Sequence, residues 1–463
     1  MSGSLHAAQA LLPGGWAAEV RLRWDAAGRL TEVRPGVAAD PADERAPGPL
    51  LPGIANLHAH AFQRLLAGLT EYRADEGGDD SFWSWRALMY RHAARIDPAA
   101  LEAIATWLYV EMLEAGYTTV CEFHYLHNAP DGRPYADDGA MARALLRAAR
   151  RAGIAITLLP VLYQQGGFGA RPTGPGQARF LRGTAALLRL FESLRAEAAA
   201  QGARCGIAPH SLRAVGPAAL REVLAGVAAI DAHAPIHIHI AEQRAEVEDC
   251  RAWSGQRPLA WLLDHAEVDA RWCLVHATHL DADEIRRGAA SGAVAGLCPT
   301  TEANLGDGLF DLPAWSAAGG RWGIGSDSQV TVDAAQELLW LEYGQRLASG
   351  RRNVAATTQQ PQVAAHLVQQ AVAGGAQASG RAAAGIAVGQ QADLVALDAG
   401  HPALAGLAPD AMLASHLFAS SRRSALAEVR VGGRRLVHGG RHALHDAAAA
   451  AFIACRRRLL AAA

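Results

Sequence analysis

Histidine and acidic residues stand at the ends of several short apolar runs, where they could bind a metal ion. His58 and His60 are two residues apart at the end of the run 52–58, so on a strand both side chains point to the same side. His239 lies in the run 235–240 and Asp327 ends the run 321–327. Three imidazoles and a carboxylate are typical zinc ligands. An HxH pair alone is weak evidence, because two ordinary histidines can have this spacing.

Two further residues could move protons beside such an ion. Glu242 follows His239 by three residues, and His276 lies in the run 272–277. A carboxylate next to a metal ligand can shuttle protons, and a histidine can polarise a reacting group. Other readings stay open at this point, since His276 could be structural and Asp327 could cap a helix. We expect His237, which shares the face of His239, to lie deeper in the core.

The residues between these runs indicate how the runs are arranged. Apolar runs alternate with Ala/Leu/Arg-rich helical patterns, and this alternation predicts an α/β fold, a (β/α)8 TIM-like barrel. At the carboxyl ends of the barrel strands, the metal-binding side chains would meet at one opening. The eight predicted strands are 52–58, 117–124, 154–163, 204–210, 235–240, 272–277, 293–298 and 321–327, and the clearest helices are 98–115, 137–152, 180–201, 217–229 and 281–291.

The two ends of the chain have a different pattern. Residues 1–50 and 381–463 contain short alternating stretches broken by glycine, as β-hairpins do. We therefore expect both termini to build one small flanking β-sandwich domain, with a helix at the C-terminus. The barrel would occupy residues 51–380.

Composition excludes several classes of function. The chain has 463 residues, of which 51% are hydrophobic and 19% charged, and its net charge is −2, which gives no reason to expect a nucleic-acid or membrane partner. Its six cysteines are scattered, which favours reduced thiols in the cytoplasm. All 43 basic residues are arginine, so Schiff-base, P-loop and carboxylated bridging lysines are impossible.

The order of these groups along the predicted strands resembles the amidohydrolase superfamily. Longer strings are similar to those of one family within it, the formimidoylglutamate deiminases, and they span almost the whole chain. The strings are SFWSWRALMYR (81–91), FHY (123–125), HSLRAV (210–215), HIHIAEQ (237–243), TTEANLGDG (300–308) and WLEYGQR (340–346). The resemblance implies a homodimeric enzyme of histidine degradation that converts N-formimidoyl-L-glutamate and water to N-formyl-L-glutamate and ammonia.

The resemblance also implies the metal content of the site. Binuclear members of the superfamily commonly bridge two metals through a carboxylated lysine on strand four, where this chain has His210. We therefore expect one Zn²⁺ per subunit, held by His58, His60, His239 and Asp327. Asp327 would accept the proton of the attacking water, Glu242 would pass a proton to the departing nitrogen, and His276 would hydrogen-bond the tetrahedral centre.

The small-molecule substrate that the resemblance implies is a dicarboxylate amidine, so its pocket would need cations. The resemblance points to Arg86 and Arg213 as the residues that bind the carboxylates, assisted by Gln63, Tyr125 and His210. Arg86 belongs to the insertion 73–86, which could act as a lid, whereas Trp83 and Trp85 are expected to pack. After GSDS the chain has Gln329, where we expect histidine to be common in relatives.

Two other functions remain as alternatives. A related deaminase of aromatic bases such as guanine or cytosine would share the metal site, but it would need a flat apolar pocket, which arginines at 86 and 213 disfavour. A catalytically inactive barrel that serves as a scaffold would be expected to lose metal ligands. Ammonia release from the candidate substrates and metal analysis separate these possibilities.

Overall fold

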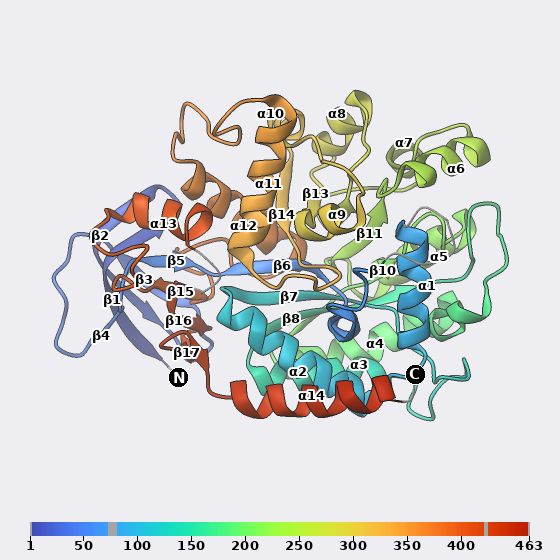
Figure 1. The fold of residues 1–463 in the computed structure, drawn as a ribbon, viewed down its shortest axis with the longest axis horizontal. Coiled ribbons are helices and arrows are strands. Elements are labelled where there is room, and N and C mark those ends of the chain that lie inside the picture. Colours follow the sequence, from blue (N-terminus) through green and yellow to red (C-terminus); the bar gives the residue numbers. More distant parts are fainter. Residues whose placement is uncertain (1, 73–80, 421–424, 462–463) are drawn as a thin grey trace.

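The chain folds into a barrel and a smaller β-domain beside it (Figure 1). The computed structural model describes residues 2–72, 81–420 and 425–461. Residues 73–80 of the expected lid therefore lie outside the described residues. The predicted fold class, with a barrel and a β-domain built from both termini, is confirmed.

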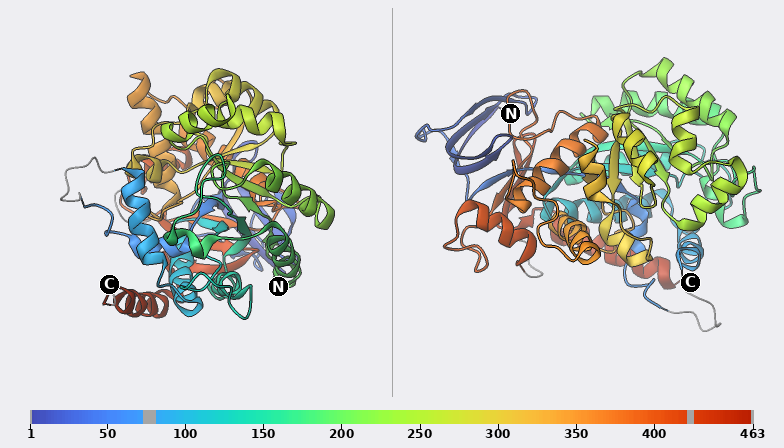
Figure 2. Two further views of the ribbon diagram at one scale, coloured as in Figure 1. Left: turned by 90° about the vertical axis from the view of Figure 1, so that its right-hand side faces the viewer. Right: turned by 90° about the horizontal axis from the view of Figure 1, so that it is seen from above.

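Eight consecutive strand positions form the barrel, and Figure 2 (left) views it nearly end-on with helices around it. Its strands are β6 (Ile54–Ala59), β7 (Tyr117–His124), β8 (Ala155–Leu162), the pair β9 (Arg204–Cys205) and β10 (Ala208–Pro209), β11 (Ile236–Ile240), β12 (Trp272–His276), β13 (Val294–Leu297) and β14 (Arg321–Ile324). They pair in parallel as two sheets, β6 to β10 and β11 to β14. Parallel bridges Ala59–Asp327 and Ser211–His239 join the two sheets, so the ring closes beside the predicted metal ligands.

The barrel strands are apolar because helices cover their outer faces while side chains fill the inside. Every residue of β7, β11 and β12 is buried. The run 204–210, predicted as one strand, is interrupted in the middle. A Cβ on Gly206 would lie 2.4 Å from the backbone oxygen of Pro235, so the chain passes its neighbour too closely there for any larger residue.

Helices surround the barrel and connect its strands. They are α2 (Pro98–Glu114), α3 (Ala140–Ala152), α4 (Thr184–Ala200), α5 (Pro217–Ile230), α6 (Arg244–Ser254), α7 (Pro258–His265), α8 (Ala282–Ala290), α9 (Pro299–Leu305), α10 (Leu312–Ala317), α11 (Ala334–Ser349) and α12 (Val363–Ser379). α2 shows why they start where they do: Pro98 occupies its first turn and the Asp97 side chain accepts a hydrogen bond from the Ala100 N–H. None of the described helices has the length and apolar character of a membrane span.

Strands from both termini form one nine-stranded sheet. The N-terminal strands are β1 (Gly3–Leu12), β2 (Gly15–Trp24), β3 (Leu30–Arg34), β4 (Glu44–Arg45) and β5 (Leu50–Pro52), and the C-terminal strands are β15 (Leu394–Leu397), β16 (Leu426–Val431), β17 (Arg434–His438) and β18 (Arg441–His442). β5 joins the two sets, because it pairs with β1 on one side and β15 on the other. Helix α13 (Pro409–Phe418) packs against α11 and α12, and α14 (His445–Ala461) lies along α2. The boundaries near 50 and 380 remain predictions.

Candidate metal centre and active site

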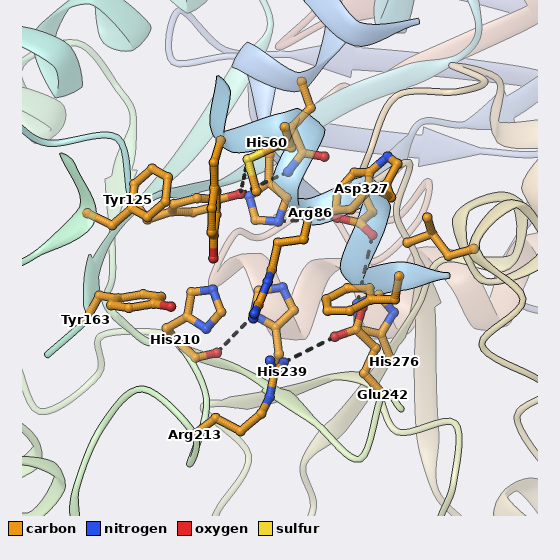
Figure 3. A pocket seen from close by; sticks show the side chains of 17 residues that line it. His60, Arg86, Tyr125, Tyr163, His210, Arg213, His239, Glu242, His276 and Asp327 are labelled. Carbon is orange, nitrogen blue, oxygen red and sulfur yellow. Dashed lines mark hydrogen bonds and ion pairs between the residues drawn. The ribbon is translucent and has the colours of Figure 1, made fainter. Parts of the chain in front are cut away.

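A pocket opens at the carboxyl ends of the barrel strands, with about 530 Å³ of free space that is partly open to solvent. All the residues predicted for the site line it except His58, which lies beneath. Figure 3 shows the imidazoles of His60, His239 and His276 and the carboxylate of Asp327 around its floor. The lining residues are His60, Gln63, Phe82, Trp85, Arg86, Met89, Tyr90, Tyr125, Tyr163, Phe180, His210, Arg213, His239, Glu242, His276, Leu305 and Asp327.

The four predicted metal ligands lie together at the pocket floor, where His58 is close to each of the other three. His58 Nε2 lies 3.0 Å from His60 Nε2 and 3.1 Å from His239 Nε2. Asp327 Oδ1 lies 3.3 Å from Nε2 of both His58 and His60. In a tetrahedral zinc site, bond lengths of about 2.0 to 2.1 Å place the ligand atoms about 3.3 to 3.4 Å apart. The observed separations are close to that spacing.

Hydrogen bonds on the far side of two rings determine which nitrogen faces the centre. His60 Nδ1 lies 2.9 Å from the Phe123 carbonyl oxygen and His239 Nδ1 lies 2.9 Å from that of His210. Carbonyl oxygens only accept, so both Nδ1 atoms carry the hydrogen and both Nε2 atoms of the neutral rings present lone pairs. Lone pairs that meet at this distance repel each other unless a cation lies between them. The donor set therefore fits a divalent metal ion.

Burial keeps His58 and His239 neutral, whereas contacts with neighbouring histidines keep Asp327 ionised. Burial, assisted by the neighbouring His60, lowers the pKa of His58 to about 3, and burial also holds the pKa of His239 well below its usual value. Burial alone would raise the pKa of Asp327, but contacts with His58 and His60 outweigh it and hold that pKa well below the usual range. Neutral imidazoles and an ionised carboxylate are the forms that bind metal.

A buried polar network fixes the backbone at Asp327, which has a left-handed φ of 45°. Gln329 Nε2 donates to the Asp327 carbonyl oxygen at 2.6 Å, and Gln329 Oε1 accepts from Ser326 Oγ at 2.7 Å. Asn56 Nδ2 in turn donates to Ser326 Oγ at 2.6 Å. Gln329 thus supports the loop that carries Asp327 and does not line the pocket.

Glu242 and His276 lie side by side next to the metal cluster. His276 Nε2 is 3.6 Å from Glu242 Oε1 and 3.9 Å from Asp327 Oδ2, while its Nδ1 is 3.3 Å from Glu302 Oε1. Burial disfavours the charged form of His276, but Glu242, Glu302 and Asp327 outweigh burial and raise its pKa to about 10. The ring therefore carries a proton on Nε2 and can donate it into the pocket.

Arg213 reaches the pocket beside Glu242 (Figure 3). One of its terminal nitrogens lies 3.4 Å from Glu242 Oε2, and its Nε lies 3.6 Å from Glu246 Oε2. Glu246 is held in turn by the backbone N–H groups of Ala241 and Glu242. Arg213 is therefore a buried, fixed cation, as recognition of a substrate carboxylate requires.

Helix α1 (Phe82–Ala93) supplies the second predicted arginine. The Arg86 guanidinium lies 4.3 Å from the ring centre of Trp83, and among the described residues no carboxylate lies within ion-pair distance of it. Trp83 and Trp85 were expected to pack: Trp85 is partly buried against the core, whereas Trp83 is 41% exposed and its ring contacts Phe82 and the Arg86 guanidinium. Trp85 lines the pocket.

The other predicted binding residues, Gln63, Tyr125 and His210, also line the pocket. Gln63 Nε2 donates to the Tyr125 hydroxyl at 2.9 Å, and burial keeps the pKa of Tyr125 well above its usual value, so that hydroxyl remains a donor. The ring of His210 lies 4.8 Å from that of His239. Burial, with Arg213 nearby, holds the pKa of His210 well below its usual value, so this ring is neutral.

Several residues at the site were not predicted. Tyr163 and Tyr90 line the pocket, and Glu302 and Asp307 lie within reach of His276. Tyr163 ends a predicted strand, which is a signal that could have identified it. The two acids belong to the string TTEANLGDG, but its pattern does not reveal which side chains turn inward.

Comparison with known proteins assigns the family. Residues 50–436 match the model of the amidohydrolase family, and residues 3–47 match "Formimidoylglutamate deiminase HutF, N-terminal domain". Formimidoylglutamate deiminase from Pseudomonas aeruginosa is 51% identical over 457 residues, covering 99% of each chain. The chain belongs to the formimidoylglutamate deiminase family of amidohydrolases.

More distant relatives share the architecture. 8-Oxoguanine deaminase from P. aeruginosa is 28% identical over 88% of each chain. A solved amidohydrolase from Brucella melitensis has a TM-score of 0.93 and 47% identity, covering 99% of this chain and all of the other. An adenosine deaminase from Xanthomonas campestris, solved with bound zinc, has a TM-score of 0.80 at 24% identity, which shows the shared fold alone.

Proposed function

We propose that the chain hydrolyses N-formimidoyl-L-glutamate to N-formyl-L-glutamate and ammonia, a step of histidine degradation. The full-length similarity to a curated formimidoylglutamate deiminase supports this reaction. The observation that carries it in the site itself is the pairing of metal-binding residues with two arginines, Arg86 and Arg213, in one pocket. The substrate has two carboxylates and one amidine, so it requires both features.

The residues at the floor of the pocket carry the chemistry in this proposal. His58, His60, His239 and Asp327 would hold a divalent ion, which would supply the Lewis-acid chemistry that makes water nucleophilic near neutral pH. Asp327 accepts a proton from the attacking water through Oδ2, the oxygen that faces His276. His276 Nε2 donates a hydrogen bond to the tetrahedral centre. Glu242 passes a proton to the departing nitrogen, so that neutral ammonia leaves.

The walls of the pocket orient the substrate. Arg213 and Arg86 bind the two carboxylates, and the Tyr125 hydroxyl, supported by Gln63, donates a further hydrogen bond. His210 contributes a neutral imidazole beside His239. Binding at two fixed charges holds the formimidoyl carbon over the floor. The entropy lost in orienting the substrate is then met on binding and no longer adds to the activation barrier.

We also infer the metal content, the compartment and the oligomeric state of the enzyme. We assign one Zn²⁺ per subunit, because the ligand set is that of mononuclear zinc and the chain has no lysine to bridge a second ion. The six buried free thiols favour the cytoplasm. A homodimer follows from the family resemblance, and analytical ultracentrifugation tests it directly.

Ammonia release from N-formimidoyl-L-glutamate, with and without a chelator, tests the proposed function. We expect turnover that the chelator abolishes and added Zn²⁺ restores. Guanine and cytosine serve as parallel substrates. Faster release from either base would replace the proposal with the base-deaminase alternative, and a purified protein that holds no divalent metal would favour a scaffold.

A further inference from the structure

Asp307 is a buried acid beside the proposed proton-transfer residues, and no step above uses it. It follows α9 between two glycines with left-handed backbone, Gly306 at φ 70° and Gly308 at φ 133°. A Cβ on Gly308 would lie 3.2 Å from the His279 ring, so the chain turns tightly there. The turn directs the Asp307 side chain inward, where only 4% of the residue is exposed.

The two carboxyl oxygens of Asp307 have different surroundings. Oδ1 accepts a hydrogen bond from Gln243 Nε2, the side chain next to Glu242. Oδ2 is buried and has no hydrogen-bond partner among the described residues. Ligand atoms of Asp307, Glu242 and His276 all lie within 4.8 Å of one another. One oxygen of Asp307 thus holds the segment that carries Glu242, and the other has no hydrogen-bond partner among the described residues.

Charge in this cluster determines the protonation of Asp307. Glu242, Glu302 and Asp327 are acidic, His276 is cationic, and His279 faces the turn from the β12 side. Burial, followed by repulsion from Glu242, raises the pKa of Asp307 to about 9. At neutral pH the carboxyl is therefore protonated, and the only oxygen free to carry its proton is Oδ2.

We propose that Asp307 is a positioning residue for Glu242, and that it acts as a neutral carboxyl which anchors Gln243 through Oδ1 and directs an O–H group toward Glu242 from Oδ2. This inference rests on the proposed role of Glu242. Ionised Asp307 would replace the O–H donor with a negative charge next to Glu242. The neutral form therefore keeps Glu242 aimed at the departing nitrogen, and loss of the Asp307 proton disturbs it.

The positioning role of Asp307 can be tested with variants of Asp307 and Gln243. For each zinc-loaded enzyme, kcat is measured across neutral and alkaline pH. In the wild type, kcat should fall as pH rises through about 9. Asp307→Asn keeps the shape of the side chain and its neutral charge. The fall in kcat at high pH, which is the alkaline limb of the pH profile, should therefore disappear or move up by about one pH unit or more. Asp307→Ala should lower kcat at neutral pH on the order of 10-fold or more, since Glu242 loses its support.

Two further variants separate positioning from a structural effect. Gln243→Leu removes the hydrogen bond that stabilises ionised Asp307, so the alkaline limb should move to higher pH even if Asp307→Asn fails to fold. Glu337→Gln is the matched control, because Glu337 is a buried acid with its pKa raised by burial to about 8 that contacts Thr300 at the other end of α9. An unchanged limb in Gln243→Leu, or an equal shift in Glu337→Gln, would overturn the proposal.

An infrared spectrum gives a readout that does not depend on turnover. The wild-type protein at neutral pH should show a protonated-carboxyl band that Asp307→Asn loses and Glu242→Gln retains. If the wild type released no ammonia from formimidoylglutamate, the proposed function would fail while this band could still be present. If the wild type turned over but Asp307→Asn lost no such band, the inference alone would fail.

Discussion

Replacement of Arg213 by alanine offers the sharpest test of how the substrate is held. The side chain is only 11% exposed, so its bond to a substrate carboxylate is little screened by water. A hydrogen bond between charged groups contributes on the order of 2 kcal/mol, which corresponds to a loss of about 30-fold in kcat/KM. Arg213 also pairs with Glu242 and Glu246, so a simple loss of activity would not prove contact with the substrate.

Comparison of Arg213→Ala with the wild type on the substrate and on two analogues removes that ambiguity. N-Formimidoylglycine lacks the side-chain carboxylate of the substrate, and N-formimidoyl-4-aminobutyrate lacks the α-carboxylate. Any disturbance of Glu242 or Glu246 in Arg213→Ala affects all three compounds equally. If Arg213 binds one carboxylate, the variant should lose about 30-fold on the full substrate and on one analogue, but little on the analogue that lacks the contacted group.

The assay measures ammonia release under kcat/KM conditions, with zinc content determined for each preparation. Arg257→Ala is the matched control, since Arg257 pairs with two carboxylates, Glu284 at 2.7 Å and Asp281 at 3.0 Å, but does not line the pocket. The control should keep kcat/KM for all three compounds. Equal losses on all three in Arg213→Ala would refute the assigned contact.

Three further outcomes follow from the site and its surroundings. Glu242→Gln should lower kcat on the order of 100-fold or more while zinc stays bound, because the amide cannot transfer a proton; near-normal turnover would remove Glu242 from that role. Dialysis against a chelator should lower the melting temperature as well as abolish activity, since the ion binds only the folded ligand set; an unchanged melting temperature would contradict this. Burial raises the pKa of Glu337 from 4.5 to about 8, so its contribution to stability is full below 4.5 and is lost as pH rises through 8. Urea titrations should show the free energy of unfolding of the wild type falling over that range relative to Glu337→Gln, and parallel curves would disprove the assignment.

The sequence predicted the barrel because its strands are buried on both faces and therefore read as unbroken apolar runs. Those runs also place His58, His60, His239 and Asp327 near strand ends, where the barrel geometry alone brings them together. Residues on the connecting loops could not be predicted in the same way. Asp307 turns inward because of the backbone at Gly306 and Gly308, and no periodic pattern encodes that direction.

Sequence periodicity could not predict the proposed substrate-binding residues either. Arg86, Arg213 and Tyr125 were predicted through resemblance to a family and not from periodicity. Trp83 was expected to pack but is 41% exposed, because the orientation of α1 depends on tertiary contacts. The break in the fourth strand at Gly206 likewise depends on how closely the chain approaches Pro235, and the local sequence does not show that approach.

Four side chains from distant parts of the chain are placed to bind one metal ion at the pocket floor. An anomalous difference map measured at the zinc absorption edge from crystals of the purified protein tests it most directly. We predict a single peak about 2.0 to 2.2 Å from Nε2 of His58, His60 and His239 and from a carboxylate oxygen of Asp327. A map with no peak at this position, or with two metal peaks in the pocket, would contradict the proposed mononuclear site.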